Sequence, residues 1–547
     1  MPEVGRRINN MSSIQYTTPL FQFLGATFFH MVPEKIIERR EFDNSSVSIG
    51  LLDGEWHYCV TPGEAELGPM DIERIESKIK RLPETLSIDV QDLLREQRLA
   101  KELLQANFLN DCNDLDFSHD AVFPRIISKY CIGLGVIEDL LADELVEDII
   151  ISSPCSENRV HVATRLSDVS LGSVYCKTNL VLSSELLRAM VNRICIFGNK
   201  ELTLNSPVVE TDIPYLNARV SAVDYPVSPQ GLSVAIRRRS SGLWTLARLI
   251  SLGSISWTVA GFLSLCCAAK ASIIVAGGRG SGKTTLLSAL IPELPSTGRI
   301  IIMEDTQELP VPEFQKEGFS IQRLSIDGDF HKSSSVMRAA LRMGEGPIVV
   351  GEIRGAEAKI LFESIRTGTA SSTVIGTLHA SDTDSFQSRL IFDMGIDREA
   401  LDAVEVIVFV NHRKDPNTGG YSRFVSEICA FDGKSGEFDL RPIFKFDESG
   451  LSLKPEFGLE DVGRIQAKFS SYLGIGQEDL LKASRLRGFI RLLQSNEYLR
   501  RSDDRIVSVS MTRILNKISI HEMMTLGLEE LKARVLSIVN REVGDWH

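Results

Sequence analysis

The 547-residue sequence predicts an α/β fold with a mostly parallel sheet over residues 246–430, preceded by an α+β domain and followed by a mainly helical region. Two observations support this prediction. Strand-like apolar runs alternate with helical patterns across 246–430, as expected for parallel strands joined by helices. A glycine-rich octapeptide at 277–284 also lies between such an apolar run and a helix pattern, which is the context of a phosphate-binding loop.

Composition narrows the class of protein. The net charge of −13 argues against a bulk nucleic-acid binder, for which a strongly basic domain is expected. Nine cysteines without a C-x-x-C pair suit reduced thiols in a cytosol and predict no zinc framework. The most apolar stretches, 20–32 and 255–276, each fall short of the run of about 18 clean apolar residues that a spanning helix needs. We therefore expect at most peripheral membrane contact.

Changes in residue pattern divide the chain into five predicted segments. The first lacks a recognisable motif and is expected to be specific to a partner. Short β-type runs around one helix predict the α+β domain that follows it. Ser240-Ser241-Gly242 is the best candidate for a linker. The predicted boundaries are 1–120, 121–239 for the α+β domain, 240–245 for the linker, 246–430 for the α/β domain and 431–547 for the mainly helical region.

The octapeptide at 277–284 reads Gly-Gly-Arg-Gly-Ser-Gly-Lys-Thr. Its glycines let successive backbone N–H groups curl around an anion, and the N-terminus of the following helix adds its positive end. Lys283 can then reach the β- and γ-phosphates, and Thr284 can offer its hydroxyl to Mg²⁺. The alternative is a glycine-rich turn. The predicted nucleotide-binding residues are Gly277, Gly278, Gly280, Ser281, Gly282, Lys283, Thr284 and Thr285.

Acidic residues follow two further strand-like runs. Glu304, Asp305 and Glu308 come after the run 299–303, and Glu352 comes after the run 348–351. Ligands bind at the carboxyl ends of strands in open α/β sheets, so these acids could hold Mg²⁺ or orient an attacking water. The alternatives are an acidic turn for the first group and a helix cap for Glu352.

His379 closes the apolar run 373–378 and could donate a hydrogen bond to a phosphate oxygen, although a lone histidine there is more often structural. Arg219 and Arg237 precede the linker and so lie outside the nucleotide domain. Arginines delivered from a second domain can neutralise charge on the γ-phosphate or bind the phosphates in the ground state. The alternative is a solvated basic face.

These four stretches, in this order, resemble the type II/type IV secretion system ATPase superfamily, which powers secretion, type IV pili and the archaeal flagellum. Residues 277–284 match its Walker A motif and 304–308 its Asp box. Gly-Glu-Ile-Arg-Gly at 351–355 matches its Walker B motif, and Thr-Leu-His-Ala at 377–380 its His box. The resemblance covers about 125–430 and is closest to the archaeal-type branch.

The resemblance implies a RecA-like P-loop ATPase domain that uses ATP and Mg²⁺ in a homohexamer. It also implies a polytopic membrane platform protein as partner, pilin-like subunits as cargo, and a cytoplasmic location, peripheral at the inner face of the cell membrane. The implied metal ligands are Thr284, Glu304, Asp305 and Glu352. The implied catalytic residues are Glu352, Glu308, Glu304, His379, Arg219 and Arg237.

Two departures from the family pattern stand out. The Arg-Pro-Asp that usually precedes the Walker B strand is replaced around Gly344 to Pro347, and Arg279 replaces a common threonine in the loop. The tetracysteine zinc insert of the bacterial type II branch has no counterpart, so no zinc is expected. Two other functions are weighed against a secretion motor. One is a RecA-like nucleic-acid translocating ATPase, although the acidic charge makes nucleic acid an unlikely partner, and the other is a non-hydrolysing scaffold.

Overall fold

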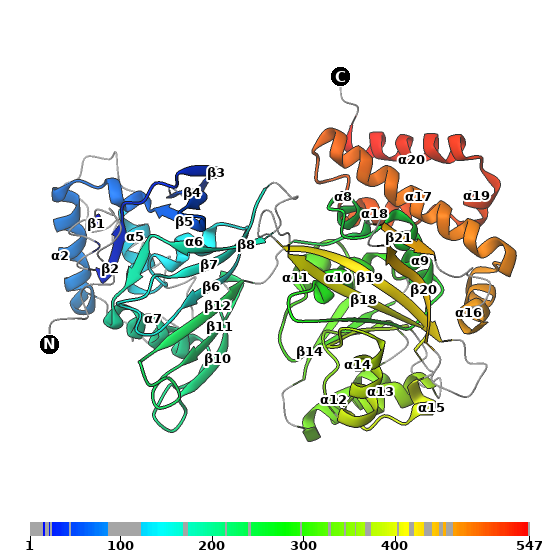
Figure 1. The fold of residues 1–547 in the computed structure, drawn as a ribbon, viewed down its shortest axis with the longest axis horizontal. Coiled ribbons are helices and arrows are strands. Elements are labelled where there is room, and N and C mark those ends of the chain that lie inside the picture. The colour runs from blue at the N-terminus through cyan, green and yellow to red at the C-terminus, as the bar shows by residue number, and fades with distance from the viewer. Residues whose placement is uncertain are drawn as a thin grey trace. The chain divides into compact units, whose positions relative to one another are not determined.

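The computed structural model divides into two compact units, and each is described here by itself (Figure 1). The first unit ends at Arg239, and the second begins at Ser240. The structure describes residues 15–16, 21, 24–42, 45–85, 122–167, 173–213, 216–238, 242–295, 298–326, 330–343, 346–355, 357–366, 373–401, 404–414, 421–431, 440–447, 452–455 and 463–544.

The first unit is built on one long, mostly antiparallel sheet. In spatial order its strands are β10 (Val208–Ile213), β11 (Ala218–Val223), β12 (Ser233–Arg238), β6 (Val146–Ile151), β7 (His161–Arg165), β8 (Ser173–Thr178), β5 (Glu55–Thr61), β4 (Ser45–Leu52) and β3 (Lys35–Phe42). A smaller sheet joins β1 (Gln15–Tyr16), β2 (Ala26–Phe29) and β9 (Leu180–Leu182). The helices are α2 (Pro69–Thr85), α5 (Val122–Cys131), α6 (Ile137–Ala142) and α7 (Ser184–Phe197).

The structure differs from the predicted boundary near residue 120. Strand β5 pairs in parallel with β8 through Tyr58 and Thr178, so the N-terminal strands extend the same sheet. Side chains from both sides of the predicted boundary, such as Ile49 and Val162, lie in one hydrophobic core. A pairing between strands this far apart in the chain leaves no local pattern in the sequence, which is why the sequence suggested a separate unit.

A buried group of charges fastens α5 and α6 to the N-terminal strands. The Lys129 ammonium lies 2.5 Å from Glu64 Oε1 and also binds Asp139. Ser45 donates a hydrogen bond of 3.0 Å to Asp139, and Tyr130 donates one of 2.9 Å to Glu64. Burial raises the pKa of Asp139 to about 6. The positive charge of Lys129 offsets only part of this rise, and the negative charge of Glu64 adds to it.

This cluster predicts a pH dependence of stability. A carboxyl group whose pKa is higher in the folded state binds its proton more tightly after folding, so its contribution to stability rises as the pH falls. For Asp139 the window runs from above about 6 down to the ordinary value of 3.8. We expect the urea midpoint of the first unit to rise, relative to that of Asp139→Asn, between about pH 8 and about pH 5. Parallel pH profiles for the two proteins would show that Asp139 is not the titrating group.

The second unit contains the predicted parallel sheet. In spatial order its strands are β15 (Ile321–Ser325), β14 (Ile300–Glu304), β16 (Ile348–Val350), β17 (Val374–Leu378), β13 (Ile273–Gly277), β18 (Val406–Lys414), β19 (Tyr421–Phe431), β20 (Leu440–Asp447) and β21 (Ser452–Pro455). Neighbours from β15 to β18 are parallel, and those from β18 to β21 are antiparallel. The fold class predicted from the sequence is therefore confirmed.

Both faces of the central parallel strands are buried, which explains why β13, β14, β16 and β17 are apolar at nearly every position. Ile273 and Val275 of β13 point into one core, whereas Ile274 and Ala276 point into the other. The first core includes residues of α8 (Leu246–Ser251), α9 (Trp257–Ala268), α10 (Lys283–Leu290), α11 (Val311–Lys316), α16 (Gly463–Leu473) and α17 (Gln477–Arg501). The second includes residues of α12 (Phe330–Arg342), α13 (Glu357–Arg366), α14 (Thr383–Ser388) and α15 (Arg398–Leu401).

The C-terminal helices form a layer over the first of these cores (Figure 1). Helix α17 crosses α9 where Gly261 meets Gly488, and a Cβ atom on Gly261 would lie 2.2 Å from the Ser484 carbonyl oxygen. Only glycines allow the two backbones to approach this closely. The layer is completed by α18 (Val509–Leu515), α19 (Ile520–Thr525) and α20 (Leu528–Val543), which pack with α17 around a core of their own.

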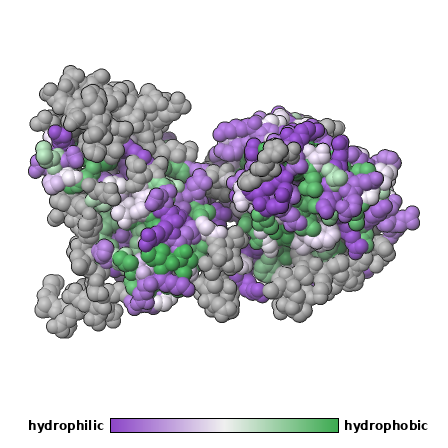
Figure 2. All heavy atoms as spheres, turned by 90° about the horizontal axis from the view of Figure 1, so that it is seen from above, coloured by the Kyte–Doolittle hydropathy of each residue, from purple (hydrophilic) through white to green (hydrophobic). Residues whose placement is uncertain are grey.

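Apolar residues reach the surface in both units, mixed with hydrophilic ones (Figure 2). The most exposed large apolar side chains include Leu204 in the first unit and Phe392 in the second. Within the described part of the chain, every helix is either too short or too polar to cross a lipid bilayer.

Candidate active site

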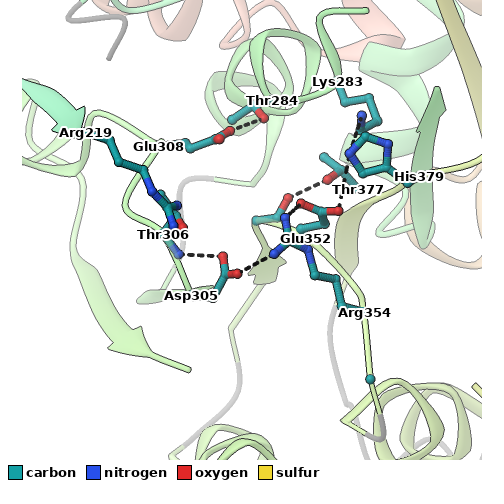
Figure 3. Close-up of polar contacts among 12 residues, drawn as sticks. Arg219, Lys283, Thr284, Asp305, Thr306, Glu308, Glu352, Arg354, Thr377 and His379 are labelled. Atoms are coloured by element: carbon teal, nitrogen blue, oxygen red, sulfur yellow. Dashed lines mark hydrogen bonds and ion pairs between the residues drawn. The ribbon is translucent and has the colours of Figure 1, made fainter. Parts of the chain in front are cut away.

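The predicted motifs follow four strands of the parallel sheet, β13, β14, β16 and β17. These strands are neighbours in the order β14, β16, β17, β13 and run in the same direction. Because the carboxyl ends of parallel strands meet at one edge, the residues that follow them are gathered there. Figure 3 shows side chains from these strand ends, among them Lys283, Glu352 and His379.

The loop between β13 and α10 has the backbone that its glycines permit. Gly280 and Gly282 have φ values of +73° and +98°, a region that residues with a side chain rarely adopt. A Cβ atom on Gly277 would lie 2.3 Å from the Val410 carbonyl oxygen, whereas Gly278 faces open space. Helix α10 then begins at Lys283, so its N-terminus points at the concave side of the loop, as anion binding requires.

Lys283 is 8% exposed and lies at the centre of the site. Its ammonium donates a hydrogen bond of 2.8 Å to the Gly278 carbonyl oxygen and lies 3.5 Å from His379 Nε2. The Ser281 hydroxyl donates to the same carbonyl oxygen at 2.9 Å. Thr284 and Thr285 follow Lys283 in the first turn of α10. The loop, the lysine and the histidine are thus in direct contact.

His379 connects the lysine to the Walker B glutamate (Figure 3). Its Nε2 atom lies 3.5 Å from Glu352 Oε1 as well as 3.5 Å from Lys283 Nζ. Burial lowers the pKa of His379, and the positive charge of Lys283 lowers it further. The lowered pKa favours the neutral ring at pH 7. Its Nε2 atom can then accept a hydrogen bond from Lys283 or donate one to Glu352, depending on which ring nitrogen carries the proton.

Arg354 links Glu352 to the Asp box. Its guanidinium donates to Asp305 Oδ2 at 2.8 Å and also binds the Glu352 carboxylate. The hydrogen bond from Arg354 to Glu352 raises the pKa of the arginine above its ordinary value. The arginine therefore stays charged and holds the two acidic motifs together.

The two glutamates of the Asp box have different surroundings. Glu308 accepts a hydrogen bond of 2.6 Å from the Thr284 hydroxyl, so it faces the phosphate loop. Glu304 is only 2% exposed, and its Oε1 atom accepts the N–H groups of Glu308 and Leu309 at 2.9 and 2.8 Å. Burial raises the pKa of Glu304, against the hydrogen bond from Leu309. Glu304 therefore holds the backbone that presents Glu308, and its role as a metal ligand stays a prediction.

Oxygen atoms beside the loop could contribute to a magnesium site. Within the described ranges, no group of three or more His, Cys, Asp or Glu side chains is gathered to hold a metal, so the predicted ligands form no ready cage. Mg²⁺ usually takes one or two protein oxygens together with water and substrate phosphates. The Thr284 hydroxyl beside the Glu308 carboxylate supplies oxygens of that kind next to the loop.

The two predicted arginines of the first unit lie on neighbouring strands. Arg219 on β11 is directly opposite Arg237 on β12, so both side chains project from the same face of the sheet. Arg219 Nη2 lies 2.7 Å from Glu210 Oε2, and Arg237 Nε lies 3.7 Å from Asp148 Oδ1. Their contact with a nucleotide stays a prediction.

Sequence reasoning missed two arginines of the second unit. Arg389 donates a hydrogen bond of 2.7 Å to the His379 carbonyl oxygen, and Arg423 Nε donates one of 2.9 Å to the Gly280 carbonyl oxygen. Arg389 lies ten residues after His379, and this short separation in the sequence could have suggested a contact between them. Arg423 lies on β19, and nothing in the sequence near it indicates the phosphate loop.

The parallel sheet, with a glycine loop and acidic strand ends at one edge, defines the class as a RecA-like P-loop domain that follows an α+β domain. The chain belongs to the family described as Type II/IV secretion system protein, whose match spans residues 134–414. That span covers the last strands of the first unit and the parallel sheet of the second.

Parts of the chain are similar to known proteins. An uncharacterized protein of Methanocaldococcus jannaschii is 28% identical over 289 residues, which are 52% of this chain and 50% of that protein. The type IV secretion system protein PtlH of Bordetella pertussis is 29% identical over 234 residues, 38% of this chain and 68% of that protein. The X-ray structure of the Legionella pneumophila ATPase DotB is similar over 73% of this chain and 94% of the DotB chain, with 16% identity and a TM-score of 0.42.

Proposed function

We propose that this chain hydrolyses ATP with Mg²⁺ and acts as the hexameric motor of a secretion or pilus-type system. The observation that carries the proposal is the convergence of Lys283, His379 and Glu352 at the mouth of a phosphate-type loop. A purely structural role would not require a histidine that contacts both a lysine and a glutamate at the edge of a parallel sheet. Membership of the Type II/IV secretion system protein family supports the same reading.

The residues divide the chemistry between charge and position. The ammonium of Lys283 would leave the Gly278 carbonyl oxygen for the phosphates, since a phosphate is a stronger acceptor than a neutral carbonyl. Thr284 and Glu308 would hold Mg²⁺, which supplies charge to neutralise the transferring phosphoryl group. Glu352 would orient the attacking water and accept its proton, with His379 and Arg354 keeping the carboxylate in place.

Glu304 and Asp305 have supporting tasks in this proposal. The buried Glu304 carboxylate fixes the backbone of Glu308, so it acts as a positioning residue. Asp305 pairs with Arg354 and so limits how far that arginine can move from Glu352. On the family resemblance alone, we also propose that Arg219 and Arg237 of the first unit neutralise phosphate charge.

The finer biological setting is also proposed from the family. A homohexamer would work at the inner face of the cell membrane, in the cytoplasm, on a polytopic platform protein that handles pilin-like subunits. Release of the γ-phosphate would change the contacts of the site and so drive motion of the partner.

One experiment distinguishes a secretion motor from a nucleic-acid translocating ATPase. ATP turnover of the full chain is measured with single-stranded DNA, and separately with membranes that contain the platform protein encoded nearest its gene. Turnover stimulated by those membranes and indifferent to DNA supports the secretion motor. Stimulation by DNA alone would replace it with a translocating ATPase, and no phosphate release under any condition would leave only a scaffold.

A further inference from the structure

The hairpin of β18 and β19 pairs with β13, the strand that leads into the phosphate loop. Strand β18 pairs in parallel with β13, and its Val410 lies opposite Gly277, the first loop glycine. Strand β19 returns antiparallel to β18, with Arg423 opposite His412. Arg423 is therefore placed beyond the end of β13, beside the loop.

Arg423 contacts the loop at two of its glycines, Gly280 and Gly282. Its Nε atom donates a hydrogen bond of 2.9 Å to the Gly280 carbonyl oxygen. Its aliphatic stem also lies against Gly282, because a Cβ atom on that glycine would be 3.5 Å from Arg423 Cδ. A charged donor on a backbone carbonyl makes a stronger hydrogen bond than a neutral one, so this contact restrains the peptide between Gly280 and Ser281.

The orientation of that peptide matters for anion binding. In a trans peptide the C=O of Gly280 and the N–H of Ser281 point in opposite directions. Holding the carbonyl outward toward Arg423 therefore directs the Ser281 N–H into the loop. There the N–H donates to the Gly278 carbonyl oxygen at 3.4 Å, and Lys283 Nζ donates to the same oxygen at 2.8 Å. The Ser281 N–H and the Lys283 ammonium, both of which can bind a phosphate, thus point toward the same carbonyl oxygen.

We propose that Arg423 is a positioning residue that presets the phosphate loop for its nucleotide and couples nucleotide binding to the β18–β19 hairpin. The inference rests on the proposed nucleotide-binding function and extends it to a residue outside the four family motifs. It also implies reciprocity, because a contact that favours the nucleotide-binding form of the loop must itself be favoured by bound nucleotide.

The first test compares nucleotide affinity among variants of the full chain. Arg423→Ala is expected to weaken ADP binding about tenfold, the effect of one hydrogen bond from a charged donor. The KM for MgATP should rise by a similar factor while kcat falls much less, since the hydrogen bond from Arg423 goes to a carbonyl oxygen of the loop backbone and not to the groups that carry out the reaction. Arg423→Lys keeps a charged donor and should restore most of the affinity. ADP binding by Arg423→Ala as tight as that of the wild type would overturn the inference.

Arg413 provides a matched control on the same hairpin. It is exposed, and none of the described contacts runs from it to the loop, so Arg413→Ala removes the same charge without touching the phosphate loop. Its ADP affinity should equal that of the wild type. An equal loss in Arg413→Ala and Arg423→Ala would mean that charge alone acts, and the positioning role would be wrong.

A second measurement needs no substitution. Adding ADP to the wild-type chain should slow amide hydrogen exchange in β18 and β19 as well as in the loop, because the coupling is reciprocal. Protection confined to the loop would overturn the inference while leaving the proposed function intact. A wild-type chain that binds no ADP would instead refute the proposed function itself.

Discussion

Replacing Glu352 by glutamine is expected to lower ATP turnover by about 10²- to 10⁴-fold, the usual contribution of a general base, while ATP binding is retained. Glutamine keeps the size of the side chain but cannot accept a proton from the attacking water. Lys283 and the loop are untouched by the change, and Glu352 is not one of the groups that hold the loop backbone. Phosphate release and equilibrium ATP binding, measured on the same preparation, separate the two effects.

A suitable control is Glu313→Gln in α11, outside the group of contacts around Lys283. Its turnover should match that of the wild type. If Glu352→Gln retained turnover within about twofold of the wild type, Glu352 would not be the base, and Glu308 would take its place as the candidate.

Replacing Arg491 by alanine is expected to lower the free energy of unfolding by about 3–5 kcal/mol, the cost of leaving a buried partner charge uncompensated. Arg491 and Glu293 are both 0% exposed, and two guanidinium nitrogens contact the carboxylate at 2.9 and 2.7 Å. Burial opposes the ionisation of Glu293. The charge and hydrogen bonds of Arg491, together with the charge of Arg487 and the Ser264 hydroxyl, outweigh it and keep the pKa of Glu293 below its ordinary value. Urea unfolding of the full chain measures the loss.

Arg485 lies on the same helix, α17, but is exposed, so Arg485→Ala is the matched control and should change stability little. A loss below about 1 kcal/mol in Arg491→Ala would contradict the account, because it would mean that water or Arg487 compensates Glu293. Burial, together with the neighbouring charge of Arg491, lowers the pKa of Arg487 to about 10, so it shares this low-polarity environment.

The Arg491–Glu293 pair also joins the C-terminal helices to the helix that follows the phosphate loop. Glu293 ends the short helical turn Ile291–Glu293 that directly follows α10, the helix whose N-terminus forms the phosphate loop. Ser264 of α9 and Asn516 donate to the same carboxylate at 2.6 and 3.2 Å. The C-terminal helical layer is thereby fixed to the far end of the loop helix.

Much of the site could be predicted because its signals are local. Each motif directly follows an apolar strand in the sequence, so the residue order alone places Glu352 and His379 at strand ends. The parallel direction of those strands then brings them together, and this too follows from the alternation of strands and helices. The confirmed fold class rests on the same local pattern.

The remaining features depend on contacts between distant parts of the chain. Arg423 reaches Gly280 across 143 residues, and Arg491 reaches Glu293 across 198. The sequence around each arginine has no feature that distinguishes it from an ordinary charged residue. Glu304 shows a different limit, because its position beside Glu308 was predictable, whereas the direction of its side chain toward the backbone was not.

Mg²⁺-dependent ATP binding and turnover, measured side by side for the wild-type chain and Lys283→Ala, decide whether the strand ends form a nucleotide site. Alanine is a good helix former, so α10 should persist, while the charge that meets the phosphates is lost. We expect the wild type to retain and hydrolyse ATP and Lys283→Ala to do neither. A wild-type chain that cannot retain ATP, or a Lys283→Ala variant that turns it over normally, would contradict the claim that these strand ends form one nucleotide site.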